Sequence, residues 1–163
     1  MREIKIRGKR LDNGEWLYGN FIELRNPFNH EDSPACFIMP KEVNIADPDS
    51  IAEQEVVDPA TVGQFTGLLD KNGREIYEGD IVDYISPFFR DLTYPSYPEA
   101  PVDPKHFYRC VVVWNERDCG FGLVSLKEAL LKPIEQQPVG ITQISDSYLI
   151  GNIHDNPELL KHE

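Results

Sequence analysis

The alternation of apolar and polar residues at the start of the chain predicts a β-hairpin over residues 3–24. Isoleucine alternates with lysine and arginine in residues 4–7, which is the period of two expected of a half-buried strand. Residues 12–14, Asp-Asn-Gly, tolerate positive φ and predict the turn. The return strand then carries the aromatic residues Trp16, Tyr18 and Phe21.

Shorter apolar runs bounded by turn residues predict further strands. They lie at residues 36–39, 62–66, 76–77, 81–85, 108–114, 121–124 and 148–153. Capping-box patterns predict short helices over residues 51–57 and from residue 125 towards Pro133. The sequence Asn156-Pro157-Glu158 predicts a third helix start, with asparagine as the cap. Because no long amphipathic helix alternates with the strands, the fold is predicted to be mainly β, of the α+β kind.

The character of the chain changes near Pro59. Residues 1–60 predict a hairpin followed by a short helix, whereas residues 61–163 predict closely spaced strands and tight turns. We therefore expect an SH3-like small barrel in residues 61–163, preceded by an appendage that is a candidate oligomerisation region. A chain of 163 residues suits one domain of this size with such an appendage.

Two turns dominate the predicted barrel. Asn72-Gly73 separates two of its strands, and Gly79-Asp80 precedes an apolar strand. In the structural interpretation the glycine allows a tight turn and the aspartate side chain accepts backbone N–H groups. The alternative is an enzyme in which Glu78 and Asp80 form a catalytic or metal-binding carboxylate pair. The structural interpretation is favoured, because no histidine or second acidic cluster lies at ligand spacing.

Residues 86–107 predict a long insertion between two barrel strands. Prolines 95, 98, 101 and 104 recur every three residues, which would align them along one edge of a polyproline II helix. The insertion also carries Tyr94 and Tyr97, which are candidates for an interaction surface. One interpretation is a strap that binds a partner. The favoured one is a strap that is packed across the barrel or flexible, because no arginine lies where an SH3 ligand would place one.

Charged residues are unevenly distributed along the chain. Aspartate and glutamate number 28 against 16 lysines and arginines, giving a net charge of −12, which suits nucleic-acid binding poorly. Residues 42–58 hold six acidic residues and no basic ones, whereas the first strand is basic. One interpretation is that this strand meets an acidic segment, in the same chain or in a second copy. The basic residues named as a candidate interaction surface are Arg2, Lys5, Arg7 and Lys9.

The same basic strand is the best sequence signal for nucleic acid. Basic residues beside aromatic ones can bind single strands through stacking. The competing interpretation places the aromatic side chains in the core and the basic ones in solvent on the opposite face. Given the overall acidity, this second interpretation is favoured, and nucleic-acid binding is kept as an alternative.

No motif in the chain indicates chemistry. Four histidines are scattered, the three cysteines include no C-x-x-C pair, and no phosphate-binding loop or zinc signature is present. We therefore expect no catalytic residue, no metal and no cofactor. No apolar run reaches the length needed to cross a bilayer, and the cysteine content suits a reducing compartment. The expected location is the cytoplasm.

Three stretches together resemble the YopX family of phage and prophage proteins. They are residues 7–19, residues 62–84, which include Gly63-Gln-Phe-Thr-Gly67 and Tyr77-Glu-Gly-Asp80, and residues 150–160. The resemblance implies an N-terminal α/β appendage followed by an SH3-type barrel, and it implies no reaction. The chain departs from the pattern in its long proline-rich insertion and in the apolar Leu69 before a turn.

The function predicted from the sequence is that of a non-enzymatic protein-interaction module. It would self-associate through its N-terminal hairpin and bind a host or phage protein. By analogy of fold, small barrels commonly act through exposed loops and edges rather than through a chemical site.

Overall fold

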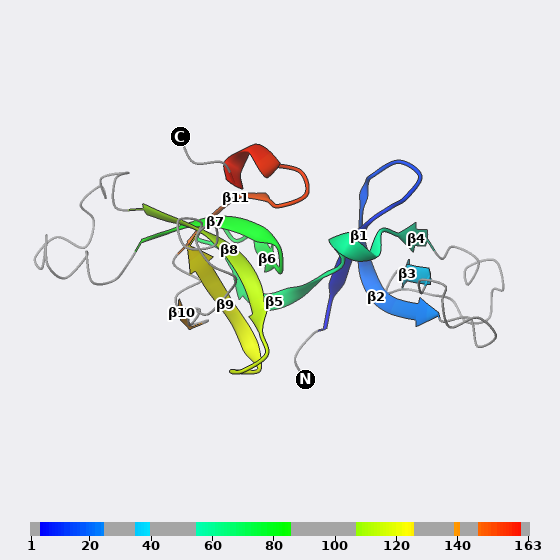
Figure 1. Cartoon of the computed structure of the whole chain (residues 1–163), viewed down its shortest axis with the longest axis horizontal. Helices are drawn as coiled ribbons and strands as arrows, with labels where there is room; N and C mark the ends of the chain where they lie inside the picture. The colour runs from blue at the N-terminus through cyan, green and yellow to red at the C-terminus, as the bar shows by residue number, and fades with distance from the viewer. Residues whose placement is uncertain are drawn as a thin grey trace, which may run out of the picture. The chain divides into compact units, whose positions relative to one another are not determined.

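The computed structural model describes residues 4–24, 35–39, 55–85, 107–125, 139–140 and 147–160. The chain divides into two compact units, Met1–Gly67 and Leu68–Glu163. All regular structure in the described residues is β-strand or short 3-10 helix, so the fold is mainly β (Figure 1). The strands form two antiparallel sheets, of six and five strands.

The N-terminal unit begins with the predicted hairpin. Its strands are β1 (Ile6–Lys9), β2 (Trp16–Leu24), β3 (Ala35–Met39) and β4 (Glu55–Val57). The 3-10 helix η1 (Pro59–Thr61) then leads into β5 (Gly63–Leu69), which pairs with β1. These strands belong to the six-stranded sheet, whose order is β4-β3-β2-β1-β5-β6, so β1 lies between β2 and β5. The last strand, β6 (Glu75–Tyr77), belongs to the C-terminal unit.

The core of this unit is a small apolar cluster of Cys36, Ile38 and Val57, which are each at most 4% exposed. The inward face of β1 has a glycine above the cluster, and a Cβ on Gly8 would lie 3.1 Å from both Ile38 and Val57. Backbone pairing also brings β4 to the end of β1, because Val57 bridges Arg10. The unit therefore curls around its core.

The prediction of a helix over residues 51–57 is wrong for the last three residues. Residues 55–57, which belong to the capping-box helix expected over 51–57, form β4 instead. They pair with β3, and Val57 is completely buried against Cys36 and Ile38. Burial of β-branched residues in a sheet thus outweighed the local capping signal. Residues 51–54 lie outside the described residues.

The C-terminal unit is built on a five-stranded sheet of order β10-β9-β8-β7-β11 (Figure 1). Its elements are β6 (Glu75–Tyr77), β7 (Asp80–Ile85), β8 (Phe107–Asn115), β9 (Gly120–Ser125), β10 (Val139–Gly140), β11 (Tyr148–Asn152) and the 3-10 helix η4 (Pro157–Leu160). β8 pairs with β7 and β9, as its run of valines predicted for a central strand.

Both faces of this sheet carry an apolar cluster. On one face Val82, Cys110, Val112 and Leu123 join Ile76 of β6 in a buried cluster. On the other face Ile81 and Val111 pack against residues that include Ile153, Leu159 and Leu160. η4 therefore covers the second face with apolar side chains. Because the strands are buried on both faces, their sequences are nearly continuous apolar runs.

Several sequence predictions need correction or fall outside the described residues. No α-helix and no closed barrel are present in the part of the chain described here, so the α/β character of the appendage is not found. Ser125, where a helix was expected to begin, is the last residue of β9. The rest of that predicted helix and residues 86–106 of the insertion lie outside the described ranges. Among the described residues, no helix is long and apolar enough to cross a membrane.

Candidate functional site

The sheet of the N-terminal unit has a second face, which we call the outer face. Residues directly opposite each other on paired strands share a face, and successive residues alternate between faces. The register pairs Arg7 with Tyr18 and Lys9 with Trp16 on this face. It also aligns Ile22 with Phe37 and Phe37 with Val56. The outer face therefore carries a cation–aromatic end on β1 and β2 and an apolar row across β2, β3 and β4.

Cations and aromatic rings are in direct contact at the first end. The Arg7 guanidinium carbon lies 4.6 Å from the centre of the Trp16 ring, and the Lys9 ammonium lies 5.7 Å from the same ring. The Lys5 ammonium lies 5.7 Å from the Tyr18 ring. Each such contact contributes about 0.5–1 kcal/mol where it is exposed, so the aromatic residues fix the directions of the cations.

This arrangement corrects the interpretation that placed the aromatic residues in the core. Phe21 does pack on the core cluster, but Trp16 and Tyr18 lie on the same face as the basic side chains. The physical reason is the strand period: Trp16 and Tyr18 differ from Phe21 in parity, so they point to opposite faces.

Exposure separates the predicted interaction residues. Tyr18 is 47% exposed, whereas Arg7 is only 5% exposed. Lys5 and Lys9 are partly exposed. Arg7 is therefore a buried member of the outer face rather than a freely accessible contact. The other predicted interaction residues, Arg2, Tyr94 and Tyr97, lie outside the described residues.

In the C-terminal unit, a buried carboxylate holds the turn at Asn72-Gly73 to strand β11. Asp70 Oδ1 accepts the backbone N–H groups of Asn72 (2.8 Å) and Arg74 (2.9 Å). Its Oδ2 accepts Nε and Nη2 of Arg74 (2.9 and 2.7 Å) and the backbone N–H of Leu149 (3.1 Å). Burial alone raises the pKa of Asp70, but these hydrogen bonds outweigh it and lower the pKa to about 2.

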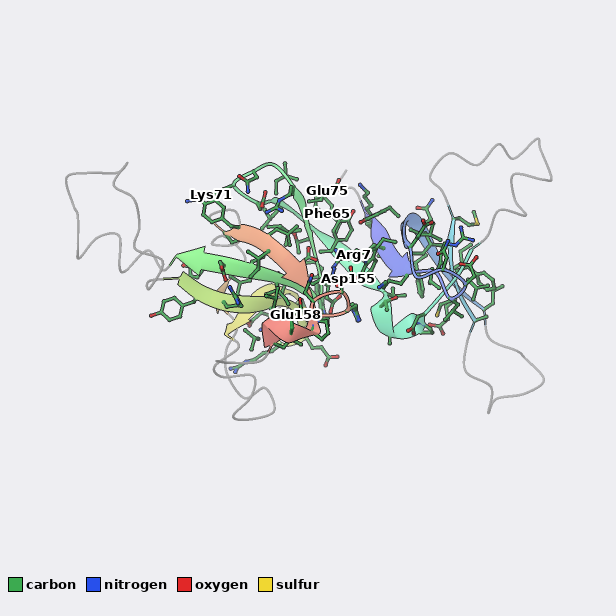
Figure 2. The ribbon with its side chains drawn as sticks, turned by 90° about the horizontal axis from the view of Figure 1, so that it is seen from above. Arg7, Phe65, Lys71, Glu75, Asp155 and Glu158 are labelled. Atoms are coloured by element: carbon green, nitrogen blue, oxygen red, sulfur yellow. The ribbon has the colours of Figure 1, made fainter. Side chains whose placement is uncertain are left out.

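Three further contacts extend this junction between the Asn72-Gly73 turn and β11, which we call the Asp70 latch. Arg74 Nη2 donates to the Leu149 carbonyl, and the Lys71 backbone N–H donates to the Ser147 carbonyl at 3.1 Å. The Lys71 ammonium also lies 5.3 Å from the centre of the Tyr148 ring. Lys71 belongs to the turn and Glu75 begins β6 (Figure 2). Backbone groups of Ser147 and Leu149, at the edge formed by β11, are thus hydrogen-bonded to the turn and its side chains.

The second predicted turn is organised around Asp80, which is 1% exposed. Asp80 Oδ2 accepts the backbone N–H of Tyr77 at 2.8 Å, and Gly79 adopts a φ of 81°, which favours glycine. Gly79 N–H donates to the Val112 carbonyl, and Gly79 O accepts Ile153 N–H, both at 2.9 Å. The turn is therefore tied to β8 and to the segment after β11.

Glu78 and Asp80 act here as hydrogen-bond acceptors within the fold. Glu78 Oε1 accepts the backbone N–H of Trp114 at 3.3 Å, while Asp80 is engaged within its own turn. In the described residues, no group of three or more histidine, cysteine or acidic side chains is placed to hold a metal ion. Cys36 and Cys110 are buried and Cys119 is exposed, all as free thiols.

The C-terminal motif forms a compact loop that meets the Gly79 turn. Asn152 Oδ1 accepts the backbone N–H groups of His154 and Asp155, both at 2.9 Å. The predicted cap at Asn156 differs in detail, because its Oδ1 accepts Asn152 N–H at 3.2 Å rather than a donor of η4. The backbone carbonyl of Asn156 instead accepts Leu159 N–H. Two motifs that are far apart in sequence therefore form one structural junction.

Sequence reasoning did not identify the Asp70 latch. A local signal exists, because an aspartate four residues before an arginine brackets the Asn72-Gly73 turn. The long-range partner, Leu149, contributes only backbone groups. Since any residue supplies such groups, no side-chain pattern could have indicated it.

Comparison with known proteins agrees with this architecture. A family model described as YopX protein matches residues 5–161. No curated protein matches the chain. Among solved structures, the crystal structure of protein EF1440 from Enterococcus faecalis is similar, with a TM-score of 0.50 and 24% sequence identity. The match covers 99% of this chain and 100% of that one. Neither description states an activity, and the structural likeness concerns the fold alone.

Proposed function

This chain belongs to the YopX family, and we propose that it is a non-enzymatic interaction module that self-associates through the outer face of its N-terminal unit. The observation that supports this most strongly is the apolar row Ile22, Phe37 and Val56 on that face. Val56 is 42% exposed, and Tyr18, on the same face, is 47% exposed. Apolar residues gathered on one sheet face are a common sign of an interaction surface.

The charge of the outer face suggests which part of a second copy it meets. Lys5 and Lys9 are partly exposed on a chain whose net charge is −12. Residues 42–58 of another copy contain six acidic residues and no basic ones. Complementary charges of this kind set orientation and partner choice more than they set affinity. We propose that the apolar row provides the affinity and that the lysines orient the partner.

Sedimentation velocity of the full chain tests self-association. We expect an oligomer that dissociates with dilution, and we expect Val56→Lys to shift it towards monomer, because the change places a charge in the apolar row. Tyr108→Lys is the matched control, since Tyr108 is similarly exposed, at 39%, but lies on β8 of the five-stranded sheet in the C-terminal unit. A wild-type protein that stays monomeric at all concentrations contradicts the proposal. Equal dissociation by both variants contradicts the assignment to the outer face.

The C-terminal unit is proposed to be an SH3-like barrel in an incomplete form. Its short strands, tight turns and central β8 support this. The Asp70 latch also supports this proposal, because the turn that precedes β6 forms hydrogen bonds with backbone groups at the edge of β11. The engagement of Glu78 and Asp80 in structural hydrogen bonds supports a role other than catalysis. Replacing both residues with alanine should destabilise the fold rather than remove an activity.

We propose that this chain is a phage or prophage protein that acts in the cytoplasm on a host or phage partner. The family membership supports this proposal. A tagged pull-down with nuclease treatment, read by mass spectrometry at low and moderate salt, tests it. Retention of one protein in stoichiometric amount at both salt concentrations supports it. Recovery of nucleic acid alone contradicts it.

Nucleic-acid binding is a second candidate because Trp16 and Tyr18 share a face with Lys5 and Lys9. An exposed aromatic ring between cations can stack on a base of a single strand. Fluorescence anisotropy with a labelled oligothymidine tests it, with Tyr18→Ala compared against Tyr108→Ala. Tyr108 is 39% exposed and lies in the other unit. Binding that falls with salt and is lost only in Tyr18→Ala supports this candidate.

A further inference from the structure

The chain contains two Asn-Gly sequences, and the structure places both at exposed turns. Asn13-Gly14 lies between β1 and β2, and Asn72-Gly73 lies between β5 and β6. Such pairs undergo spontaneous succinimide formation, since glycine presents no side chain to hinder ring closure. We infer that Asn72 is a site of self-modification to aspartate and isoaspartate, that Asn13 is protected, and that the change at Asn72 releases the Asp70 latch.

The reaction requires only water. The backbone nitrogen of the glycine loses its proton and attacks Cγ of the asparagine. A C–N bond forms and the bond between Cγ and Nδ2 breaks. Water accepts the proton from the glycine nitrogen and supplies one to Nδ2, which leaves as ammonia. Water then opens the succinimide at either carbonyl, which gives aspartate or isoaspartate. Isoaspartate adds one carbon atom to the main chain, and both products add a negative charge.

The two glycines are closely matched as attacking groups. Gly14 and Gly73 have φ values of 72° and 79°. A Cβ at either position would have no neighbour within 4 Å. Both N–H groups are engaged to a similar degree, Gly14 with the Arg10 carbonyl at 3.0 Å and Gly73 with the Asp70 carbonyl at 2.9 Å. The backbone therefore gives neither site an advantage.

The two asparagine side chains differ. Asn13 Oδ1 accepts the Glu15 backbone N–H at 2.9 Å, and Asn13 Nδ2 donates to Glu15 Oε2 at 3.1 Å. These bonds engage both polar atoms of the Asn13 amide, so the side chain must break them before it can turn towards the Gly14 nitrogen. Within the described residues, the Asn72 side chain makes no hydrogen bond. It is free to rotate towards the Gly73 nitrogen.

The position of Asn72 gives the change a structural consequence. Asp70 Oδ1 accepts the N–H groups of both Asn72 and Arg74, which bracket the reacting bond. A longer main chain moves these two donors apart, so one carboxylate oxygen no longer reaches both. The new carboxylate also competes with Asp70 for Arg74, whose side chain is 49% exposed. The hydrogen bond from Leu149 N–H to Asp70 is then weakened.

Ageing of the folded full-length protein in mildly alkaline buffer tests whether Asn72 converts faster than Asn13. Peptide mass spectrometry follows both sites, and a urea-unfolded sample corrects each rate for its local sequence. We expect Asn72 to convert severalfold faster than Asn13 in the folded protein after this correction. Glu15→Ala should raise the rate at Asn13, and Asn72→Gln, whose longer side chain disfavours the five-membered ring, should abolish conversion at position 72. Equal rates at the two sites, or a faster rate at Asn13, overturn the inference.

Hydrogen exchange on the aged sample tests whether conversion at Asn72 releases the Asp70 latch. The converted chains should lose protection at the Leu149 amide while the Val111 amide, in the central strand, keeps its protection. Aged Asn72→Gln should keep protection at both amides. Full protection of Leu149 in converted chains overturns the claim that the modification releases the Asp70 latch.

Discussion

Asp70 is a buried carboxylate that joins a turn to strand β11, and its substitution should destabilise the C-terminal unit. Its two oxygens accept five hydrogen bonds from Asn72, Arg74 and Leu149. In Asp70→Asn one oxygen becomes an NH₂ donor that faces other donors, so the loss should be about 2 kcal/mol or more. Chemical denaturation read by intrinsic fluorescence measures it.

The same residue predicts how stability depends on pH. The pKa of Asp70 is about 2 in the folded chain, against about 3.9 when unfolded. Because the folded pKa is depressed, the stabilisation is fully present above about pH 4 and is lost as pH falls towards 2. The difference corresponds to roughly 2–3 kcal/mol. In Asp70→Asn this part of the acid dependence should disappear.

Asp12→Asn is the control for both measurements. Asp12 pairs with Arg10 at 2.6 Å, but its side chain is 61% exposed. An exposed pair contributes little, so this variant should unfold with the wild-type midpoint and the wild-type acid dependence. If it lost as much stability as Asp70→Asn, the special role assigned to the buried carboxylate would be wrong.

Among the elements, strand β2 depends on a glycine where the backbone of β3 passes closely. A Cβ on Gly19 would lie 1.9 Å from the Met39 carbonyl oxygen, a distance that no real contact allows. Gly19→Ala should therefore displace β3 from β2 and cost several kcal/mol, more than the about 1–3 kcal/mol of ordinary overpacking. Loss of hydrogen-exchange protection in β2 and β3 measures the effect.

Gly14→Ala separates this packing effect from a backbone effect. Gly14 has a φ of 72° and a Cβ there would meet no atom within 4 Å, so only conformational strain of about 1–2 kcal/mol is expected. A loss at Gly14→Ala as large as that at Gly19→Ala would show that close approach of β3 is not the cause.

The elements also show how far sequence alone could lead. The hairpin over residues 3–24 and the valine-rich central strand were predictable, because strand periodicity and β-branched composition act locally. The strand at residues 55–57 was not, since its capping pattern favoured a helix and only pairing with β3 reveals the strand. The outward direction of Trp16 and Tyr18 could have been deduced from parity with Phe21, but the acidity of the chain argued against it.

At the scale of the whole molecule, net charge sets how self-association should respond to salt. Each chain carries −12, so two copies repel one another, and salt screens that repulsion over a Debye length of about 10 Å at 0.1 M. The apolar row would hold the copies together with little direct dependence on salt. A contact between Lys5 or Lys9 and acidic residues would instead weaken as salt rises.

These two contributions have opposite signs, so the salt dependence identifies the dominant one. If the apolar row supplies most of the affinity, association should strengthen from low to moderate salt as repulsion is screened. The double variant Lys5→Gln/Lys9→Gln should then change affinity little, while Val56→Lys abolishes association. Sedimentation equilibrium over a salt series measures this. Association that weakens steadily with salt and is lost in the lysine variant would instead assign the affinity to the charged contact, because removal of two cations then removes the attraction itself.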